Sequence, residues 1–479
     1  MKKILILMLM VAGFKSEGQT KIYGTLTDYK KKPLQGGSIS IKDSYDGATT
    51  DSLGNFSFTT SETGDHLLET SLSGYNTFEK SINIVGKEIR INISIKELIT
   101  ELNAVTITAG SFEAGDKKKG TVLSDLDIVT TASANGDITG ALKTLPGAQQ
   151  VGESEGLFVR GGTATESKIF IDGNLVNNFF YSSLPGLATR GRFNPFLFKG
   201  TVFSAGGYSA LYGQALSAAL ILESKDLPDK TEASLNFSVI GAGAGIQKLS
   251  KNKKSSWGVT YNYTNLALAF AAIKQKQDFY ITPMYHQGDA NFRIKTKNGG
   301  MIKYYGYLSW NRVGIKNPDI DSMNLKDAFN IENLNTYHNL SWRESIGNGW
   351  KLNTGLSFST NKDNIINELQ DANNTKQVFT LPAGYAYKNF NLQNKDRYAQ
   401  AKIVFEKRMK GLNTLRFGVE HLYSNEKATY TLYDGSKYDN IVKDNLTAAF
   451  AETDFYITND IAAKTGGRME YSALMKKWN

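Results

Sequence analysis

Two glycine-punctuated stretches decide the fold of this chain. The first reads Gly156-Leu-Phe-Val-Arg-Gly-Gly-Thr163 and leads into Lys168-Ile-Phe-Ile-Asp-Gly-Asn174. The second runs from Arg192 to Gly213 and contains Phe203-Ser-Ala-Gly-Gly-Tyr208 at its centre. Short apolar runs broken by glycine clusters are typical of short strands joined by tight turns and bulges. Asp172-Gly173 is a strong signal for a hairpin turn. These stretches therefore predict a small mixed domain.

In this order the two stretches resemble the plug domain of TonB-dependent outer-membrane receptors, over residues from about 136 to 224. The resemblance implies a domain that closes the lumen of a β-barrel. We expect Arg160 to bond to plug or barrel-wall groups rather than to a ligand, and Asp172 to be a turn residue. Arg160-Gly-Gly lacks the spacing of a phosphate-binding loop. The residues that carry the resemblance are Arg160, Gly161, Gly162, Asp172, Gly173, Gly206 and Gly207.

Composition excludes several classes of protein. Charged residues make up 21% and hydrophobic residues 41% of 479 residues, which excludes a disordered chain. The net charge is +9, but Lys and Arg are dispersed, so we expect solvated loop charges and no nucleic-acid partner. The absence of cysteine excludes disulfides, a cysteine nucleophile and thiolate metal sites. None of the four histidines pairs with another ligand at metal-binding spacing, so we expect no enzyme, metal or cofactor.

The N-terminus carries an export signal. Met1-Lys-Lys3 is followed by an apolar run from Ile4 to Phe14, and Ser16 and Gly18 occupy the −3 and −1 positions before Gln19. The apolar run is too short to span a bilayer, which predicts a cleaved signal peptide over residues 1–18. No other apolar stretch is long enough for a transmembrane helix.

Residues 19–97 alternate apolar and polar side chains in short runs, which predicts a seven-stranded β-sandwich. Gly24-Thr-Leu-Thr-Asp28, Pro33-Leu34 and Thr50-Asp-Ser-Leu-Gly-Asn-Phe56 resemble the carboxypeptidase-regulatory-like domain. Because a zinc peptidase needs three ligands and a carboxylate base, we expect a non-catalytic accessory domain.

Residues 98–120 form a linker, and the resemblance to these receptors implies that it holds a TonB box. Such a box binds a TonB-type energy-transducing protein by adding a strand to the edge of the partner's sheet. Val105, Thr106, Ile107 and Thr108 have the required extended, β-branched character and no proline. The same residues fit a last strand of the sandwich equally well.

The plug is predicted over 121–228 and part of an antiparallel transmembrane β-barrel over 229–479. The barrel region alternates in segments of about ten residues, as transmembrane strands do. For example, Leu415, Phe417 and Val419 oppose Arg416, Gly418 and Glu420. We expect short periplasmic turns and long external loops at about 311–334, 361–396 and 424–446. About ten strands are predicted, roughly half of a plugged 22-stranded barrel. We therefore expect the N-terminal part of a receptor, or a chain completed by a second one.

The predicted fold class is mainly β: sandwich, small α+β plug and partial barrel. The resemblance implies a TonB-dependent receptor in the outer membrane, with a periplasmic sandwich, that takes up a scarce solute of unknown class. The expected partners are a TonB-type protein, outer-membrane lipid and the solute. A β-rich outer-membrane protein that binds or signals without transport is the alternative, because fold alone does not fix function.

Overall fold

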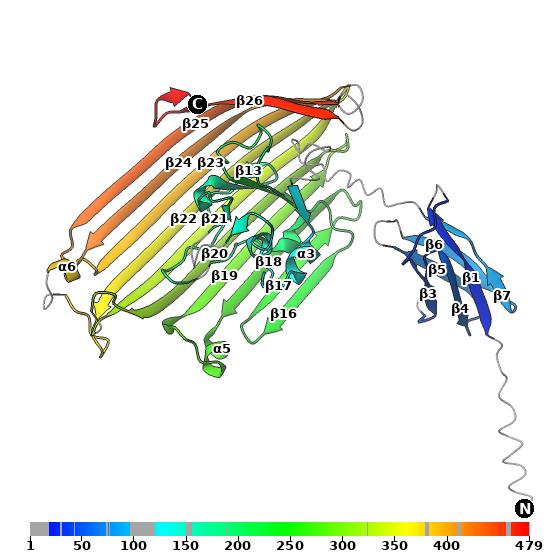
Figure 1. Cartoon of the computed structure of the whole chain (residues 1–479), viewed down its shortest axis with the longest axis horizontal. Coiled ribbons are helices and arrows are strands. Elements are labelled where there is room, and N and C mark those ends of the chain that lie inside the picture. Colours follow the sequence, from blue (N-terminus) through cyan, green and yellow to red (C-terminus); the bar gives the residue numbers. More distant parts are fainter. Residues whose placement is uncertain are drawn as a thin grey trace, which may run out of the picture. The chain divides into compact units, whose positions relative to one another are not determined.

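The computed structural model describes residues 19–28, 31–42, 44–72, 75, 77–95, 120–149, 156–187, 189–322, 324–378, 383–409, 413–456 and 461–478. The chain divides into two compact units, residues 1–107 and 108–479 (Figure 1). The predicted signal peptide and the candidate TonB box, Val105 to Thr108, lie outside the described residues. No helix within the described part of the chain is long and apolar enough to cross a membrane.

The first unit is a sandwich of two four-stranded sheets. Its apolar core lies between them and includes Ile22, Leu26, Ile39 and Leu68, all fully buried. One sheet contains β1 (Thr20–Asp28), β4 (Asn55–Thr60), β7 (Glu88–Arg90) and β8 (Ile93–Ile95). The other contains β2 (Ser38–Ile41), β3 (Gly47–Thr49), β5 (Gly64–Ser71) and β6 (Phe78–Ile84). The predicted sandwich is confirmed, with eight described strands instead of seven.

The extra strand arises where the last alternating run of the sandwich is interrupted. β7 and β8 both pair with β1 in parallel, and the chain between them crosses close to Gly24. An added Cβ on Gly24 would lie 1.7 Å from the Ile91 carbonyl oxygen. Only glycine leaves room for this backbone approach.

The plug is the small domain formed by residues 120–224. Its five-stranded mixed sheet has the order β13-β12-β15-β14-β9. Ser124 caps the first helix through a capping box with Asp127, and Asp137 caps the second. The spacing of apolar residues after Asp137, ended by Pro146-Gly147, predicts the second helix, and no comparable pattern marks the first. The bounds are β9 (Gly120–Leu123), α3 (Asp125–Thr130), α4 (Ile138–Leu142), β10 (Ala148–Gln149), β11 (Phe158–Val159), η2 (Ala164–Glu166), β12 (Ser167–Ile171), β13 (Asn174–Leu175), η3 (Pro195–Leu197), β14 (Phe198–Ser204) and β15 (Ala218–Ser224).

The plug lies against one face of a twelve-stranded antiparallel sheet, which we call the wall (Figure 1). Its strands pair in chain order, and its middle strands are long. The bounds are β16 (Glu232–Ser238), β17 (Gly241–Leu249), β18 (Ser255–Asn265), β19 (Asp278–Lys295), β20 (Met301–Pro318), β21 (Lys326–Gly347), β22 (Trp350–Gln370), β23 (Phe390–Arg408), β24 (Thr414–Leu432), β25 (Lys437–Tyr456), β26 (Ala462–Ser472) and β27 (Lys477–Trp478). Two short helices, α5 (Ala267–Ala272) and α6 (Ala383–Ala386), lie in connections.

The predicted lengths of strands and loops were wrong. The expected loops at 311–334 and 424–446 are mostly strand, and the expected loop at 361–396 begins and ends in strand, because the ladders between β20 and β25 continue into them. The apolar-polar alternation is irregular in these stretches, where Val313, Ile315 and Ile331 pack into a small buried apolar cluster, yet the backbone pairing continues. The apolar pattern therefore marks only the part of each strand that matches a hydrocarbon layer. The described wall also has twelve strands rather than about ten.

The two ends of the wall differ in their connections, as expected of periplasmic turns and external loops. We call them the turn end and the loop end. The turn end has only short connections, at 250–254, 296–300, 348–349, 409–413 and 457–461. The loop end has connections at 239–240, 266–277, 319–325, 371–389, 433–436 and 473–476, and these include the longest ones.

Candidate functional site: the contact between plug and wall

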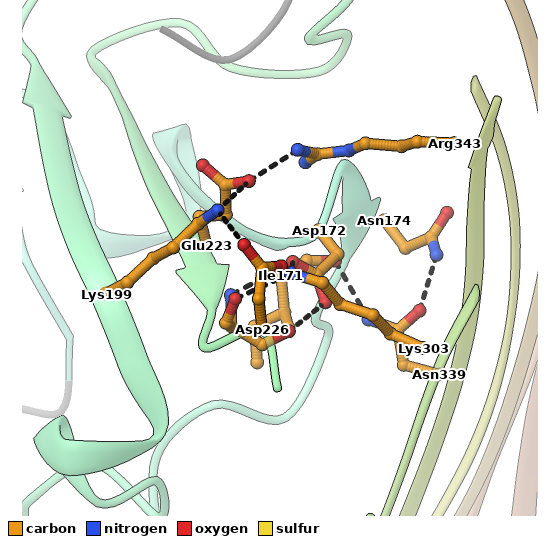
Figure 2. A network of polar contacts seen from close by, with 10 residues as sticks. Ile171, Asp172, Asn174, Lys199, Glu223, Asp226, Lys303, Asn339 and Arg343 are labelled. Carbon is orange, nitrogen blue, oxygen red and sulfur yellow. Dashed lines mark hydrogen bonds and ion pairs between the residues drawn. The ribbon is translucent and has the colours of Figure 1, made fainter. Parts of the chain in front are cut away.

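A network of six charged side chains joins the plug to the wall near its turn end (Figure 2). Lys303 of β20 lies 2.7 Å from an Asp226 carboxylate oxygen, and its ammonium group donates to the Ser224 carbonyl at 2.7 Å. Arg343 of β21 pairs with Glu223 at the end of β15. Lys199 of the plug bridges the Glu223 and Asp226 carboxylates at 3.1 and 2.8 Å.

Asp172 is the sixth member and the most buried acid of the network. It occupies a hairpin turn between β12 and β13 with φ of 50°, followed by Gly173 at 90°, as a type I′ turn requires. Its carboxylate accepts hydrogen bonds from the Ser224 amide at 3.0 Å and the Ser224 hydroxyl at 2.6 Å. The Lys303 ammonium is 3.9 Å away. Asp172 is thus the predicted turn residue and also a charged contact with the wall.

The charges of the network lower the pKa values of Asp172 and Asp226. Burial raises the pKa of Asp172. Lys303, Arg343 and the Ser224 hydrogen bonds lower this pKa by more than burial raises it, so the net pKa is below the ordinary value. Burial also opposes ionisation of Asp226, and nearby Lys303 and Lys199 hold its pKa well below the usual range. Asp172 and Asp226 are therefore ionised at neutral pH, and Lys303 stabilises the charged form of each.

Amide groups continue the contact beside the Asp172 turn. The Asn174 amide donates to the Asn339 side-chain oxygen at 2.6 Å, and Asn339 donates to the Ile171 carbonyl at 2.9 Å. The Leu175 backbone amide donates to Gln400 of β23 at 2.7 Å. Backbone groups of β12 and β13 thus find hydrogen-bond partners on the wall, which satisfies donors and acceptors that would otherwise be buried unpaired.

A second polar contact lies farther along the wall. The Ser209 hydroxyl and the Ala210 amide both donate to one Glu452 carboxylate oxygen, at 2.6 and 2.9 Å. Arg416 of β24 pairs with the other Glu452 oxygen at 3.2 Å and with Asp454 at 2.5 Å. Lys402 donates to the Leu211 carbonyl at 2.5 Å. Much of the contact is therefore polar, the kind of surface that can exchange protein partners for water.

A pocket of about 540 Å³ lies between the plug and the wall on the side of the loop end. Plug residues 133–144 and 181–190 line most of it, and Tyr285 and Val313 of the wall close it. The nearby Gly186 carbonyl accepts a hydrogen bond from Gln277, in a long loop-end connection. The lining of the pocket includes Lys143 and Arg190. The buried Asp137 carboxylate also lines the pocket, but it already accepts hydrogen bonds from the Gly140 and Gly191 backbone amides.

The remaining predicted residues lie together in the plug but away from the charged network. Arg160 is exposed, has φ of 51°, and packs beside Gly206, where an added Cβ would be 3.4 Å from its guanidinium. A Cβ on Gly162 would be 1.9 Å from the Ser217 hydroxyl. Gly161 and Gly207 have φ of 82° and 68° and so require glycine-type backbone. These positions shape turns, and their functional importance stays a prediction.

Sequence reasoning missed the wall half of the contact. Lys303 and Arg343 lie on β20 and β21, and no motif in the sequence marks either residue as a contact of the plug. A usable signal was present for Lys303, which stands between the large side chains of Ile302 and Tyr304, whereas Arg343 is followed by Glu344. Within the described residues, no group of His, Asp and Glu is placed to hold a metal ion.

Comparison with known proteins identifies the folds of both units. Residues 22–107 match the CarboxypepD_reg-like domain family, a range that includes Val105 to Ile107. The pyoverdine-bound FpvA of Pseudomonas aeruginosa superposes with a TM-score of 0.53 and 11% identity, over 75% of this chain and 52% of that one. The chain has the fold of a TonB-dependent outer-membrane receptor.

Two further solved receptors show the same fold. The outer-membrane transporter YddB of Escherichia coli gives a TM-score of 0.52 at 10% identity, covering 75% of this chain and 57% of that one. A mutant of the ferric enterobactin receptor PfeA of P. aeruginosa gives a TM-score of 0.51 at 14% identity, covering 76% of this chain and 59% of that one. The chain thus spans between half and two thirds of the length of these receptors. A search of curated proteins found no match.

Proposed function

We propose that this chain serves the active uptake of a scarce solute across the outer membrane, powered by a TonB-type protein. The observation that carries the proposal is a separate small domain held against a membrane-type sheet by polar contacts. Such a contact is stable while its charges remain paired, and it can open when a force separates them, because water can solvate both sides. The matched receptors have the same fold; one of them is named as a ferric enterobactin receptor, and another was solved with a pyoverdine and iron bound.

The pocket at the loop end is the proposed first binding site for the solute. It lies on the side from which an external solute would arrive, between the plug and the wall, so movement of the plug would open it inward. Its accessible charges are the cations Lys143 and Arg190. A positive lining favours an anionic solute, since the opposite charge repays part of the cost of losing water.

The energy source is proposed to act through residues 105–108. An extended β-branched segment between the sandwich and the plug can add a strand to a partner's sheet, and main-chain hydrogen bonds then transmit a pull. The chain re-enters described structure at β9, an edge strand of the plug sheet that pairs with β14. Tension at this strand would act on the sheet whose far side holds Asp172.

The proposal is tested in cells that carry the intact gene, by uptake of radiolabelled or metal-labelled solutes under iron and carbon limitation. Ile107→Pro removes a strand donor in the candidate TonB box, and Lys118→Pro is the matched control in the linker. We expect Ile107→Pro and deletion of the TonB-type gene to abolish uptake while surface binding persists. Uptake that survives loss of the partner would overturn the proposal. Binding without uptake in the unmodified strain would favour the non-transporting receptor.

A further inference from the structure

Three lysines face one another across neighbouring strands on the outer face of the wall, the face away from the plug. Lys362 of β22 is directly opposite Lys395 of β23, and Lys395 is directly opposite Lys427 of β24. Gln400 and Lys402 of β23 point to the plug, so the odd-numbered positions of this strand point outward. Arg397 therefore adds a fourth cation on the same face, two residues from Lys395.

This row is unfavourable in the absence of a counter-charge. Like charges directly opposite on a sheet destabilise the pairing of the strands. Lys427 has an acidic partner, Asp439, at 2.9 Å. Within the described residues, Lys362, Lys395 and Arg397 make no ion pair and no side-chain hydrogen bond, and all three are exposed. Glu332, the nearest outward acid on β21, already accepts a hydrogen bond from the Trp310 indole.

Toward the turn end the same face becomes apolar. The outward side chains Leu356 and Phe358 of β22, Ile403 of β23 and Val419 of β24 are 43–54% exposed although all are hydrophobic. Such a band of outward apolar residues is what a hydrocarbon layer covers. The lysine row therefore stands at its loop-end edge, where lipid headgroups lie.

A groove of about 410 Å³ runs through this apolar face, directly along the strand from the cations. Its floor is formed where the small Ala399 and Ala401 face outward, between Phe358 on one side and His421 and Tyr423 on the other. Ala399 is four residues from Lys395, roughly 13 Å along a strand. One ligand with an anionic head and an apolar tail can therefore occupy both features.

We propose that this face binds an anionic membrane lipid, with a phosphate among Lys362, Lys395, Arg397 and Lys427 and an acyl chain in the Ala399–Ala401 groove. A phosphate oxygen can accept from several ammonium and guanidinium groups at once, which converts their repulsion into charge-assisted hydrogen bonds. The acyl chain would lie in the groove, where the small Ala399 and Ala401 leave space between larger side chains. The inference rests on the proposed location in a membrane, and not on solute uptake.

The test uses the full chain, purified in non-ionic detergent, and counts bound lipids by native mass spectrometry. Phosphatidylglycerol and phosphatidylcholine with identical acyl chains are added separately. We expect preferential retention of phosphatidylglycerol. The variant K362Q/K395Q/R397Q should weaken its binding by on the order of 100-fold, since each cation near a membrane surface contributes about fivefold. The control K32Q/K80Q/K87Q removes the same charge from exposed positions of the first unit and should change nothing.

A second variant tests the groove without changing any charge. Ala399→Phe with Ala401→Phe fills it and should lower retention of both lipids, while inorganic phosphate added alone should not displace phosphatidylglycerol. Equal retention of the two lipids, or a charge variant that binds like the wild type, would overturn the proposal. Displacement by phosphate alone would also overturn it, because the site would then bind an ion only. Absence of solute uptake with lipid preference intact would refute only the proposed function.

Discussion

Replacing Lys303 by methionine is expected to loosen the plug at the turn end of the wall. Lys303 is 5% exposed and its ammonium contacts Asp226, Ser224 and Asp172. Methionine keeps the volume but removes the charge, so the buried Asp172 loses one of its neutralising cations. Removing one partner of a buried ion pair costs about 3–5 kcal/mol. Because Arg343 and the Ser224 hydrogen bonds remain, we expect the lower end, about 3 kcal/mol.

The effect can be measured as the stability of the plug alone. The chain has no cysteine, so a cysteine at the exposed Leu216 gives a single labelling position for a fluorophore. At a slope of about 1.5 kcal/mol per molar urea, Lys303→Met should lower the unfolding midpoint of the plug by about 2 M. Leu216→Cys in the otherwise unchanged chain is the reference.

A double-mutant cycle separates lost charge balance from lost packing. Asp172→Asn removes the orphaned charge, and asparagine tolerates the left-handed φ of that turn. The pair Asp172→Asn with Lys303→Met should therefore recover about half of the lost stability. A midpoint shift below about 0.3 M for Lys303→Met, or a double variant no more stable than the single one, would refute the charge-pairing argument.

Two other predictions follow from local geometry. The pKa values of Asp172 and Asp226 are lowered in the folded protein, so their stabilising effect is complete above the ordinary aspartate pKa near 4 and is lost as pH falls toward the lowered values. The urea midpoint of the plug should therefore be flat from about pH 8 to 5 and fall below about pH 4, and a midpoint that rises on acidification would contradict this. In the isolated sandwich, residues 19–107, Gly24→Ala forces a Cβ against the Ile91 carbonyl and should cost about 1–3 kcal/mol by thermal denaturation, whereas Ser57→Ala should be nearly neutral.

The plug was the most predictable part of the fold. Asp172-Gly173 fixes a turn type, and Asp137 before an apolar segment marks a helix start, because these signals act over a few residues. Helix α3 was missed although Ser124 and Asp127 form a capping box, since its six residues include no long apolar periodicity. Signals from a few neighbouring residues thus predicted the turn with an unusual backbone conformation and one of the two capped helices.

The strand ends and the wall half of the site were not predictable in the same way. Apolar alternation disappears beyond Phe358 on β22, yet the ladder continues to Gln370, because backbone pairing does not need an apolar face. Lys303 and Arg343 meet Asp172 and Glu223 only through the packing of the plug on the wall, more than 100 residues away in sequence. Pairings of this range depend on register across many strands, which one sequence does not specify.

The central claim is that the plug must separate from the wall for transport, and a reversible covalent lock tests it most directly. A Cβ added to Gly355 would lie 2.7 Å from the Asn174 side-chain carbonyl carbon, which places the two Cβ atoms at most about 4.2 Å apart, within reach of a disulfide. In cells with the intact gene, Asn174→Cys with Gly355→Cys should abolish uptake when oxidised and regain it after reduction, while the single variant Asn174→Cys, which cannot form the lock, transports under both conditions. Full uptake by the oxidised, quantitatively cross-linked protein would contradict the account.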